Sequence, residues 1–211
     1  MAATDPEKNP LYATAEDLHP LHWEQLARRD PEEAARAAGA SWDGQTYTLQ
    51  LLGRVLRVEP ASRSVHTADL PGRSVGFQRA LVAVAYLNGA LDVPPRGDWV
   101  AFRELPGGDG FFRGPHSLAT PRLEEAFGAE PRALVRAAEP LGWKVAQGGD
   151  VGVEIPALPR IPLRVLLWGR TEEFGASATL LTDGRAHLHL ALDVLWALSN
   201  VAISDLVKAK G

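Results

Sequence analysis

The amino-acid sequence predicts an α+β fold with a mixed or mostly antiparallel sheet, N-terminal helices and a closing C-terminal helix. Three observations support this prediction. Segments that alternate between apolar and polar residues, as half-buried strands do, fall in two blocks in the first and last thirds of the chain. Helical segments lie before, between and after these blocks, so the regular strand–helix alternation of a parallel sheet is missing. The apolar segment at residues 192–208 ends in lysine, which suits the C-terminus of a closing helix.

Composition and charge exclude several classes of function. The chain has 211 residues, of which 45% are apolar, enough for the core of one ordinary domain. Its formal charge of −4, with arginines scattered between acids, argues against a nucleic-acid partner. Without cysteine, this chain holds no disulfide, thiolate zinc site or iron–sulfur cluster. An apolar window of about 18 residues and a secretory signal are both missing, so we expect no membrane partner and a cytoplasmic location.

Capping signals predict two short helices near the N-terminus. A flexible tail is expected over residues 1–13, followed by a single domain over residues 14–211. A capping box opens the first helix, which is expected over residues 15–29. Asp30-Pro-Glu-Glu then supplies an N-cap, a proline at the first helical position and an acidic third residue, for a helix over residues 31–38.

The strand blocks predict antiparallel pairing. In the first block, Tyr47, Leu49 and Leu51 alternate with polar residues, and Gly53 and Pro60 provide turns of a meander. A helix with one apolar stripe is expected to follow, from Ser74 to Gly89. Further strands are expected over residues 99–105, 151–155, 161–168, 177–183 and 187–192. The nearly continuous apolar strand at residues 161–168 is expected to be covered on both faces.

The segment Ala101–His116 is the first candidate site. Its Pro106–Gly110 stretch lacks a phosphate-loop lysine and dinucleotide-loop spacing, so a hairpin-type turn that uses glycine at positive φ is the simpler interpretation. Phe111 and Phe112 form either a lid over a pocket or two core residues. Aromatic walls with cationic or imidazole groups suit an apolar, partly anionic ligand. The predicted ligand-binding residues are Trp99, Arg103, Phe111, Phe112, His116 and Trp168.

Other polar groups leave alternatives open. His187 and His189 have the spacing of two metal ligands on one strand face, although exposed alternating positions explain them as well. His19 and His22, three apart on a helix, form a second weak two-ligand pattern. The pair Glu172 and Glu173, with His116 as a partner, is an acid–base candidate if burial raises one carboxyl pKa. The sequence contains no nucleophile elbow or zinc-protease motif.

Three longer stretches carry a family resemblance. WVAFRELPGGDGFF (residues 99–112), GGDVGVEIPALPRIPLRVLLW (residues 148–168) and EEFGASATLL (residues 172–181) resemble the consensus of an uncharacterised prokaryotic family, domain of unknown function 3786. The resemblance covers most of residues 35–205. It implies no established activity. It does imply an association with anaerobes and with four-cysteine motifs similar to those of corrinoid iron–sulfur proteins. Thr171 departs from the Asp expected there, which weakens an enzymatic role.

These observations favour a non-enzymatic ligand-binding or accessory protein, with haem or a corrinoid as the expected cofactor class. The alternative is a protein–protein interaction module or a subunit of a larger complex, which would use a sheet edge or the apolar C-terminal helix. A hydrolase or transferase is the third and least favoured hypothesis. The sequence leaves the oligomeric state open.

Overall fold

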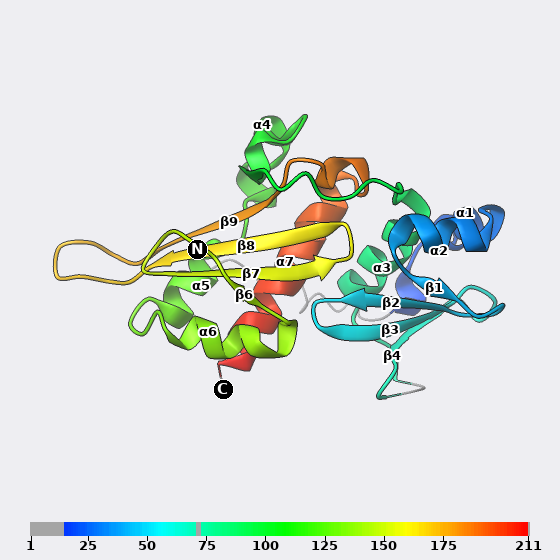
Figure 1. Ribbon diagram of the computed structural model, residues 1–211, viewed down its shortest axis with the longest axis horizontal. Coiled ribbons are helices and arrows are strands. Elements are labelled where there is room, and N and C mark those ends of the chain that lie inside the picture. Colours follow the sequence, from blue (N-terminus) through cyan, green and yellow to red (C-terminus); the bar gives the residue numbers. More distant parts are fainter. Residues whose placement is uncertain (1–14, 71–72, 211) are drawn as a thin grey trace.

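Two antiparallel sheets lie side by side in a computed structural model of the chain, which describes residues 15–70 and 73–210 (Figure 1). One sheet has the order β1-β2-β3-β4, with strands Ser41–Trp42, Tyr47–Leu51, Arg54–Glu59 and Ser64–Thr67. The other has the order β5-β9-β8-β7-β6, with strands Trp99–Ala101, Ser177–Asp183, Ile161–Trp168, Val151–Leu158 and Lys144–Val145. The predicted α+β class is confirmed, and the expected sheet is divided in two. The tail predicted at residues 1–13 lies outside the described residues.

The N-terminal helices follow from their capping residues. The second, α2 (Pro31–Ala38), has the predicted bounds, because the Asp30 carboxylate accepts a hydrogen bond from the Glu33 backbone N–H at 2.8 Å. The first predicted helix is instead split into η2 (Ala15–Asp17) and α1 (Pro20–Arg28). His19 takes an extended backbone because it precedes Pro20, and its side chain caps α1.

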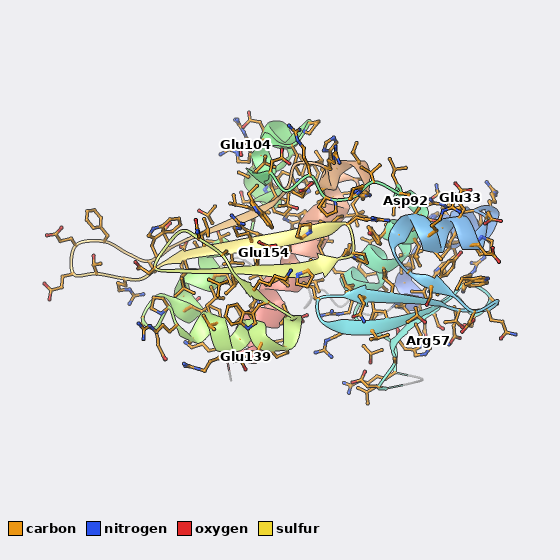
Figure 2. All side chains as sticks on the ribbon, viewed as in Figure 1. Glu33, Arg57, Asp92, Glu104, Glu139 and Glu154 are labelled. Carbon is orange, nitrogen blue, oxygen red and sulfur yellow. The ribbon has the colours of Figure 1, made fainter. Side chains whose placement is uncertain are left out.

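Helices cover one face of the five-stranded sheet. The helices α5 (Thr120–Phe127) and α6 (Ala133–Ala138) pack against its strands, and both contact α7 (Leu192–Ala209), which runs behind the sheet in Figure 1. Burial alternates along β8, so the expectation that this strand is covered on both faces is wrong. Figure 2 shows Glu154 on the opposite face, where no helix lies over it.

The helix α3 (Phe77–Gly89) lies between the N-terminal helices and α7. It packs against α7 on one side and against α1 and α2 on the other. Buried apolar side chains from both sheets and these helices belong to one core cluster. Among residues 15–70 and 73–210, no helix is both long and apolar enough to cross a membrane.

One predicted strand is shortened and another is replaced, in both cases by helical turns. Strand β5 ends at Ala101, and the chain continues through η3 (Phe102–Glu104), α4 (Gly108–Phe111) and η4 (Gly114–His116). The predicted strand at residues 187–192 is replaced by η6 (Ala186–Leu188) and the start of α7. In η6 the Leu188 N–H donates to the Arg185 carbonyl at 2.9 Å. This bond closes a 3₁₀ turn, so the segment does not extend as a strand.

Candidate functional site

Three of the predicted ligand-binding residues form an aromatic cluster. The His116 imidazole stacks on Phe111, with ring centroids 4.4 Å apart, and Phe111 meets Phe112 edge-on at 5.1 Å. Two residues that the sequence prediction missed complete the cluster: Phe102 lies edge-on to Phe112, and Trp196 of α7 lies edge-on to His116. Phe112 is buried in the core, which supports a core role rather than a lid.

The other three predicted residues lie apart from this cluster. The strand predicted over residues 99–105 ends at Ala101, so Arg103 lies in η3, where it pairs with Asp109 at 3.1 Å. The Arg164 guanidinium stacks over Trp99, 4.0 Å from the ring centroid.

Strand register separates the two tryptophans. Trp99 pairs with Asp183 of β9, and Trp168 pairs with Ser177 of the same strand. Both rings are therefore on the open face of the sheet, but six residues apart along β9, which corresponds to roughly 20 Å. Three cavities among the described residues are lined by other side chains, so the six predicted residues do not surround any of these three.

A cavity of about 690 Å³ lies where α1, α3 and the start of α7 meet. It combines cationic, imidazole and apolar groups, and we call it the histidine–arginine cavity. Its polar lining includes His22, Arg28, Arg29, Asn88, His189 and Asp193. Its apolar lining includes Ala85, Leu188, Leu190 and Val194. A second cavity of about 630 Å³ adjoins it and shares His22, Asp193 and Val194. A third, of about 600 Å³, lies between the β2–β3 hairpin, Pro140–Leu141 and the C-terminal end of α7.

Backbone contacts at the end of α3 fix the wall of the histidine–arginine cavity. The Arg29 guanidinium donates to the carbonyls of Leu87, Asn88 and Ala90, each at 2.8 Å. These carbonyls are the acceptors that a helix C-terminus leaves without intrahelical partners, so Arg29 acts as a cap. The Asn88 amide also donates to the His22 carbonyl at 2.9 Å, which ties α3 to α1.

Two buried polar atoms at this wall lack partners. The Nδ1 atom of His189 accepts a hydrogen bond from the Leu91 N–H at 3.3 Å, so the ring proton resides on Nε2. His189 is only 1% exposed, and within the described part of the chain its Nε2 has no hydrogen-bond partner; the same holds for Oδ1 of Asn88. Unsatisfied buried polar groups cost free energy, and functional sites are a common place for them.

Burial keeps the cavity imidazoles neutral. Burial lowers the pKa of His22 below its ordinary value, nearby His19 lowers it further, and Asp193 opposes the shift. Burial likewise lowers the pKa of His189, and the Arg160 charge adds to the effect. The fixed charges at the cavity are therefore those of Arg28, Arg29 and Asp193, so its net charge is positive at neutral pH.

The free energy of unfolding is expected to decrease as the pH falls from about 8 to about 5.5, because His189 protonates more readily in the unfolded chain. The unfolded imidazole has its ordinary pKa of 6.5, and the folded pKa is lower. The contribution of the neutral His189 ring to the free energy of unfolding is thus fully present above pH 6.5. It is lost as the pH falls towards the lower pKa of the folded state. Urea denaturation across this range measures the slope. In His189→Asn, whose amide oxygen replaces Nδ1 as the acceptor, the slope should be shallower; equal slopes would contradict this account.

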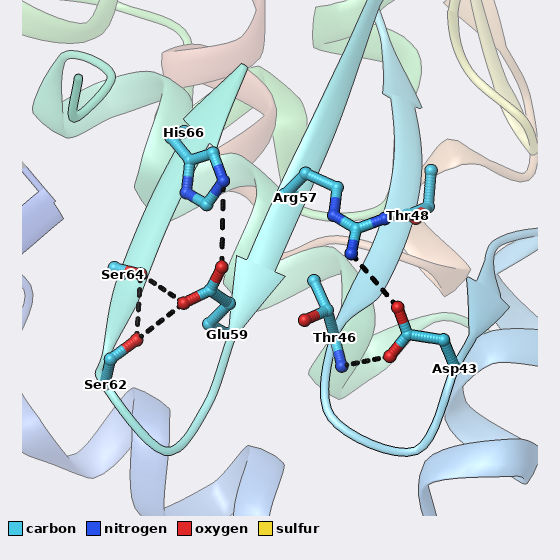
Figure 3. Close-up of polar contacts among 8 residues, drawn as sticks. All are labelled: Asp43, Thr46, Thr48, Arg57, Glu59, Ser62, Ser64 and His66. Carbon is cyan, nitrogen blue, oxygen red and sulfur yellow. Dashed lines mark hydrogen bonds and ion pairs between the residues drawn. The ribbon is translucent and has the colours of Figure 1, made fainter. Parts of the chain in front are cut away.

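A polar cluster on the four-stranded sheet superficially suggests hydrolase chemistry (Figure 3). His66 lies 3.7 Å from the Glu59 carboxylate, and the hydroxyls of Ser62 and Ser64 donate to the other oxygen of Glu59. The arrangement lacks the contact a nucleophile needs, since both serines bond to the carboxylate rather than to the imidazole. Cross-strand pairing of β3 with β4 explains the cluster.

The remaining acid and histidine candidates are dispersed. The His187–His189 segment is not a strand, so the shared strand face expected for the two imidazoles does not exist. Among the described residues, no group of three or more His, Asp or Glu side chains is arranged to hold a metal ion. Glu172 and Glu173 are exposed in the β8–β9 loop, whereas His116 belongs to the aromatic cluster beside α7.

The sequence contained weak signals for the histidine–arginine cavity. The His19–His22 spacing marked one wall, but His19 serves as the α1 cap, and its Nδ1 accepts from the Leu21 N–H. The adjacent cations Arg28 and Arg29 marked another part. His189 was noted for its spacing from His187, whereas its role at the cavity depends on a contact with Leu91, 98 residues away.

The sequence motifs indicated membership of a protein family, and a comparison with family models tests it. The family described as "Domain of unknown function (DUF3786)" matches residues 30–205. The chain belongs to this family. The match includes both sheets and the residues of the aromatic cluster. Of the histidine–arginine cavity it includes the residues from α3 and from the start of α7, whereas His22, Gln25, Arg28 and Arg29 precede the matched range. Searches for a similar curated protein and for a similar solved structure found no match.

Proposed function

We propose that this DUF3786 member is a non-enzymatic accessory domain of the cytoplasm that binds an apolar, partly anionic small molecule. The histidine–arginine cavity is the observation that carries this proposal. Its volume of about 690 Å³ lies within the usual range of small-molecule sites, about 300–1,000 Å³. Its lining combines apolar side chains with a few polar groups that converge from three helices.

The charges at the cavity favour an anionic group on the ligand. Arg28 is exposed at the cavity and forms no ion pair with another described residue, while Arg29 is held by three carbonyls. The unpartnered Nε2–H of His189 adds a donor, which suits a carboxylate oxygen once a small rearrangement brings the two together. Leu188, Leu190 and Val194 supply apolar surface for the body of the ligand.

Haem or a corrinoid is the cofactor class that we propose to test first. Haem joins a flat apolar ring to carboxylates, and the cavity offers Arg28 for the carboxylates and the neutral His22 imidazole as a nitrogen ligand. The aromatic cluster around His116 is the competing location, since it contains an exposed imidazole beside aromatic rings.

Titration with haem and with cobalamin, followed by absorption spectroscopy, tests this function. Saturable binding is expected for the native chain, and His22→Ala should weaken it by about tenfold or more, because the nitrogen ligand is lost. His116→Ala is the matched control and should bind like the native chain. The reverse pattern would move the site to the aromatic cluster. An unchanged spectrum and an unliganded mass in native mass spectrometry would contradict the proposal for both cofactors.

A protein–protein interaction module is the second candidate function. The loop between β8 and β9, residues 169–176, projects beyond the rest of the molecule (Figure 1). Near its end the Phe174 side chain is 71% exposed, and Trp168 at its base is also exposed. Apolar groups presented together on a projecting hairpin favour a docking role over a packing role.

A further inference from the structure

We infer that the tip of the β8–β9 hairpin, Thr171–Phe174, docks into the histidine–arginine cavity of a second copy of this chain. The inference goes beyond the proposed small-molecule function and does not require it. Because both would occupy the same cavity, a bound small molecule and the tip of a second copy exclude each other. It rests on the structure of the tip, the chemistry of the cavity and the distance between them on one molecule.

The tip holds an aromatic side chain in the open. The Thr171 N–H donates to the Phe174 carbonyl at 2.9 Å, and the Phe174 N–H donates back to the Thr171 hydroxyl at 3.0 Å. This reciprocal pair closes a four-residue turn and sets the position of the phenyl ring. Glu172 and Glu173 occupy the centre of the turn, are exposed and form no ion pair with any other described residue.

The base of the hairpin is anchored to the body of the protein. The Gly169 N–H donates to the Asp150 carboxylate at 2.8 Å, and the Arg170 N–H donates to the Gly128 carbonyl at 2.8 Å. A tip that is fixed before binding loses little conformational entropy on binding. The anchored turn therefore presents one phenyl ring and two carboxylates as a preorganised unit.

The histidine–arginine cavity has the complementary chemistry. Arg28 and Arg29 supply positive charge, and Leu188, which is 39% exposed, supplies apolar surface beside the buried Val194. A phenyl ring seated on the apolar wall would place the flanking carboxylates near the arginines. Such complementarity specifies a partner and steers association.

The two surfaces lie far apart on the molecule. Figure 1 shows the β8–β9 loop at one end of the longest axis and α1, which contributes His22 and Arg28 to the cavity, at the other. A chain cannot fill its own cavity across that length, so each contact joins the tip of one copy to the cavity of the next. Contacts of this head-to-tail kind build rings or open chains. A single turn buries little area, so the association is expected to be weak and concentration-dependent.

Sedimentation velocity over a concentration series, with no small molecule added, tests the inference. The native chain should sediment faster as its concentration rises, and Phe174→Ala should weaken this association by about tenfold or more. Val145→Ala is the matched control, because Val145 is 77% exposed on the edge strand β6 and lies outside both surfaces. This variant should associate like the native chain.

Charge reversal distinguishes docking in the cavity from other contacts. The double variant E172K/E173K and the single variant Arg28→Glu should each weaken association, and a chain carrying all three changes should recover part of it. A native chain that stays monomeric across the series would overturn the inference. The inference would also be overturned if Phe174→Ala associated as strongly as the native chain, or if Val145→Ala associated more weakly. A triple variant that recovered no association would overturn it as well.

Discussion

Replacing Arg79 with methionine is expected to lower the free energy of unfolding by about 3–5 kcal/mol, because it leaves a buried carboxylate without its partner. Arg79 of α3 donates from one nitrogen to both oxygens of Asp205 of α7, each at 2.7 Å. The two side chains are only 10% and 12% exposed, so water cannot replace the lost guanidinium. The pair joins the two helices that form the centre of the core.

The double variant R79M/D205L separates the cost of an unpaired charge from the value of the pair. Removing both charged groups leaves no buried ion behind, so most of the lost stability should return. Equilibrium urea denaturation of the native chain, Arg79→Met and the double variant measures all three free energies. If the double variant is no more stable than Arg79→Met, the loss comes from packing rather than from the orphaned carboxylate.

Gly53→Ala is expected to destabilise the chain by about 3 kcal/mol or more, because the added methyl group meets backbone atoms. Gly53 has a φ of +73° in the turn between β2 and β3. A Cβ atom here would lie 2.0 Å from the Pro140 carbonyl oxygen and 2.7 Å from the Leu141 Cα. Those two residues belong to η5 (Glu139–Leu141), which leads into the five-stranded sheet, so the variant pushes the two sheets apart.

Gly44→Ala is the matched control for this effect. Gly44 also has a positive φ, +100°, but a Cβ atom there would meet nothing within 4 Å. Backbone strain alone should therefore lower the free energy of unfolding of Gly44→Ala, by about 1–2 kcal/mol. Thermal and urea denaturation should therefore rank Gly44→Ala clearly above Gly53→Ala in stability. Similar losses in the two variants would show that the contact with η5 contributes little.

Elements with strong local signals were predicted closely. The helix α2 begins and ends where its cap, its proline and Gly39 place it, and the predicted strands 161–168 and 177–183 have the bounds of β8 and β9. Each depends on features within a few residues: a side chain that satisfies a free N–H, or a run of apolar residues between turns. The tail over residues 1–13 and the single domain over residues 14–211 stay predictions.

Short alternating segments were predicted wrongly where the chain folds back on itself. Over residues 102–105 and 187–192 a two-residue repeat and a 3₁₀ turn give similar patterns, because too few residues are present to separate the periods. At the first of these, Gly108 lies so close to the Phe102 carbonyl that a Cβ atom would be 2.2 Å from its oxygen. The turn itself is closed by the Leu105 N–H, which donates to the Phe102 carbonyl at 3.3 Å.

The candidate site also divides into residues that neighbouring sequence predicts and residues that only the tertiary structure places. Phe111, Phe112 and His116 were predicted together and lie together, since they are neighbours in the chain. Trp99 and Trp168 were grouped with them on chemical type and on the family resemblance, and the registers of β5 and β8 against β9 set them apart. The histidine–arginine cavity was missed because its walls come from three helices far apart in the sequence.

By itself the sequence determined the α+β class, the helix caps, the main strands and the family, because periodicity, capping and motifs are properties of neighbouring residues. The tertiary structure alone decided which charges are buried and paired and where a cavity opens. Arg79 and Asp205 are 126 positions apart, and nothing near either one indicates the other. Burial and pairing arise only when distant segments pack, so the environment that sets the chemistry of His189 and Arg28 is a property of the folded chain.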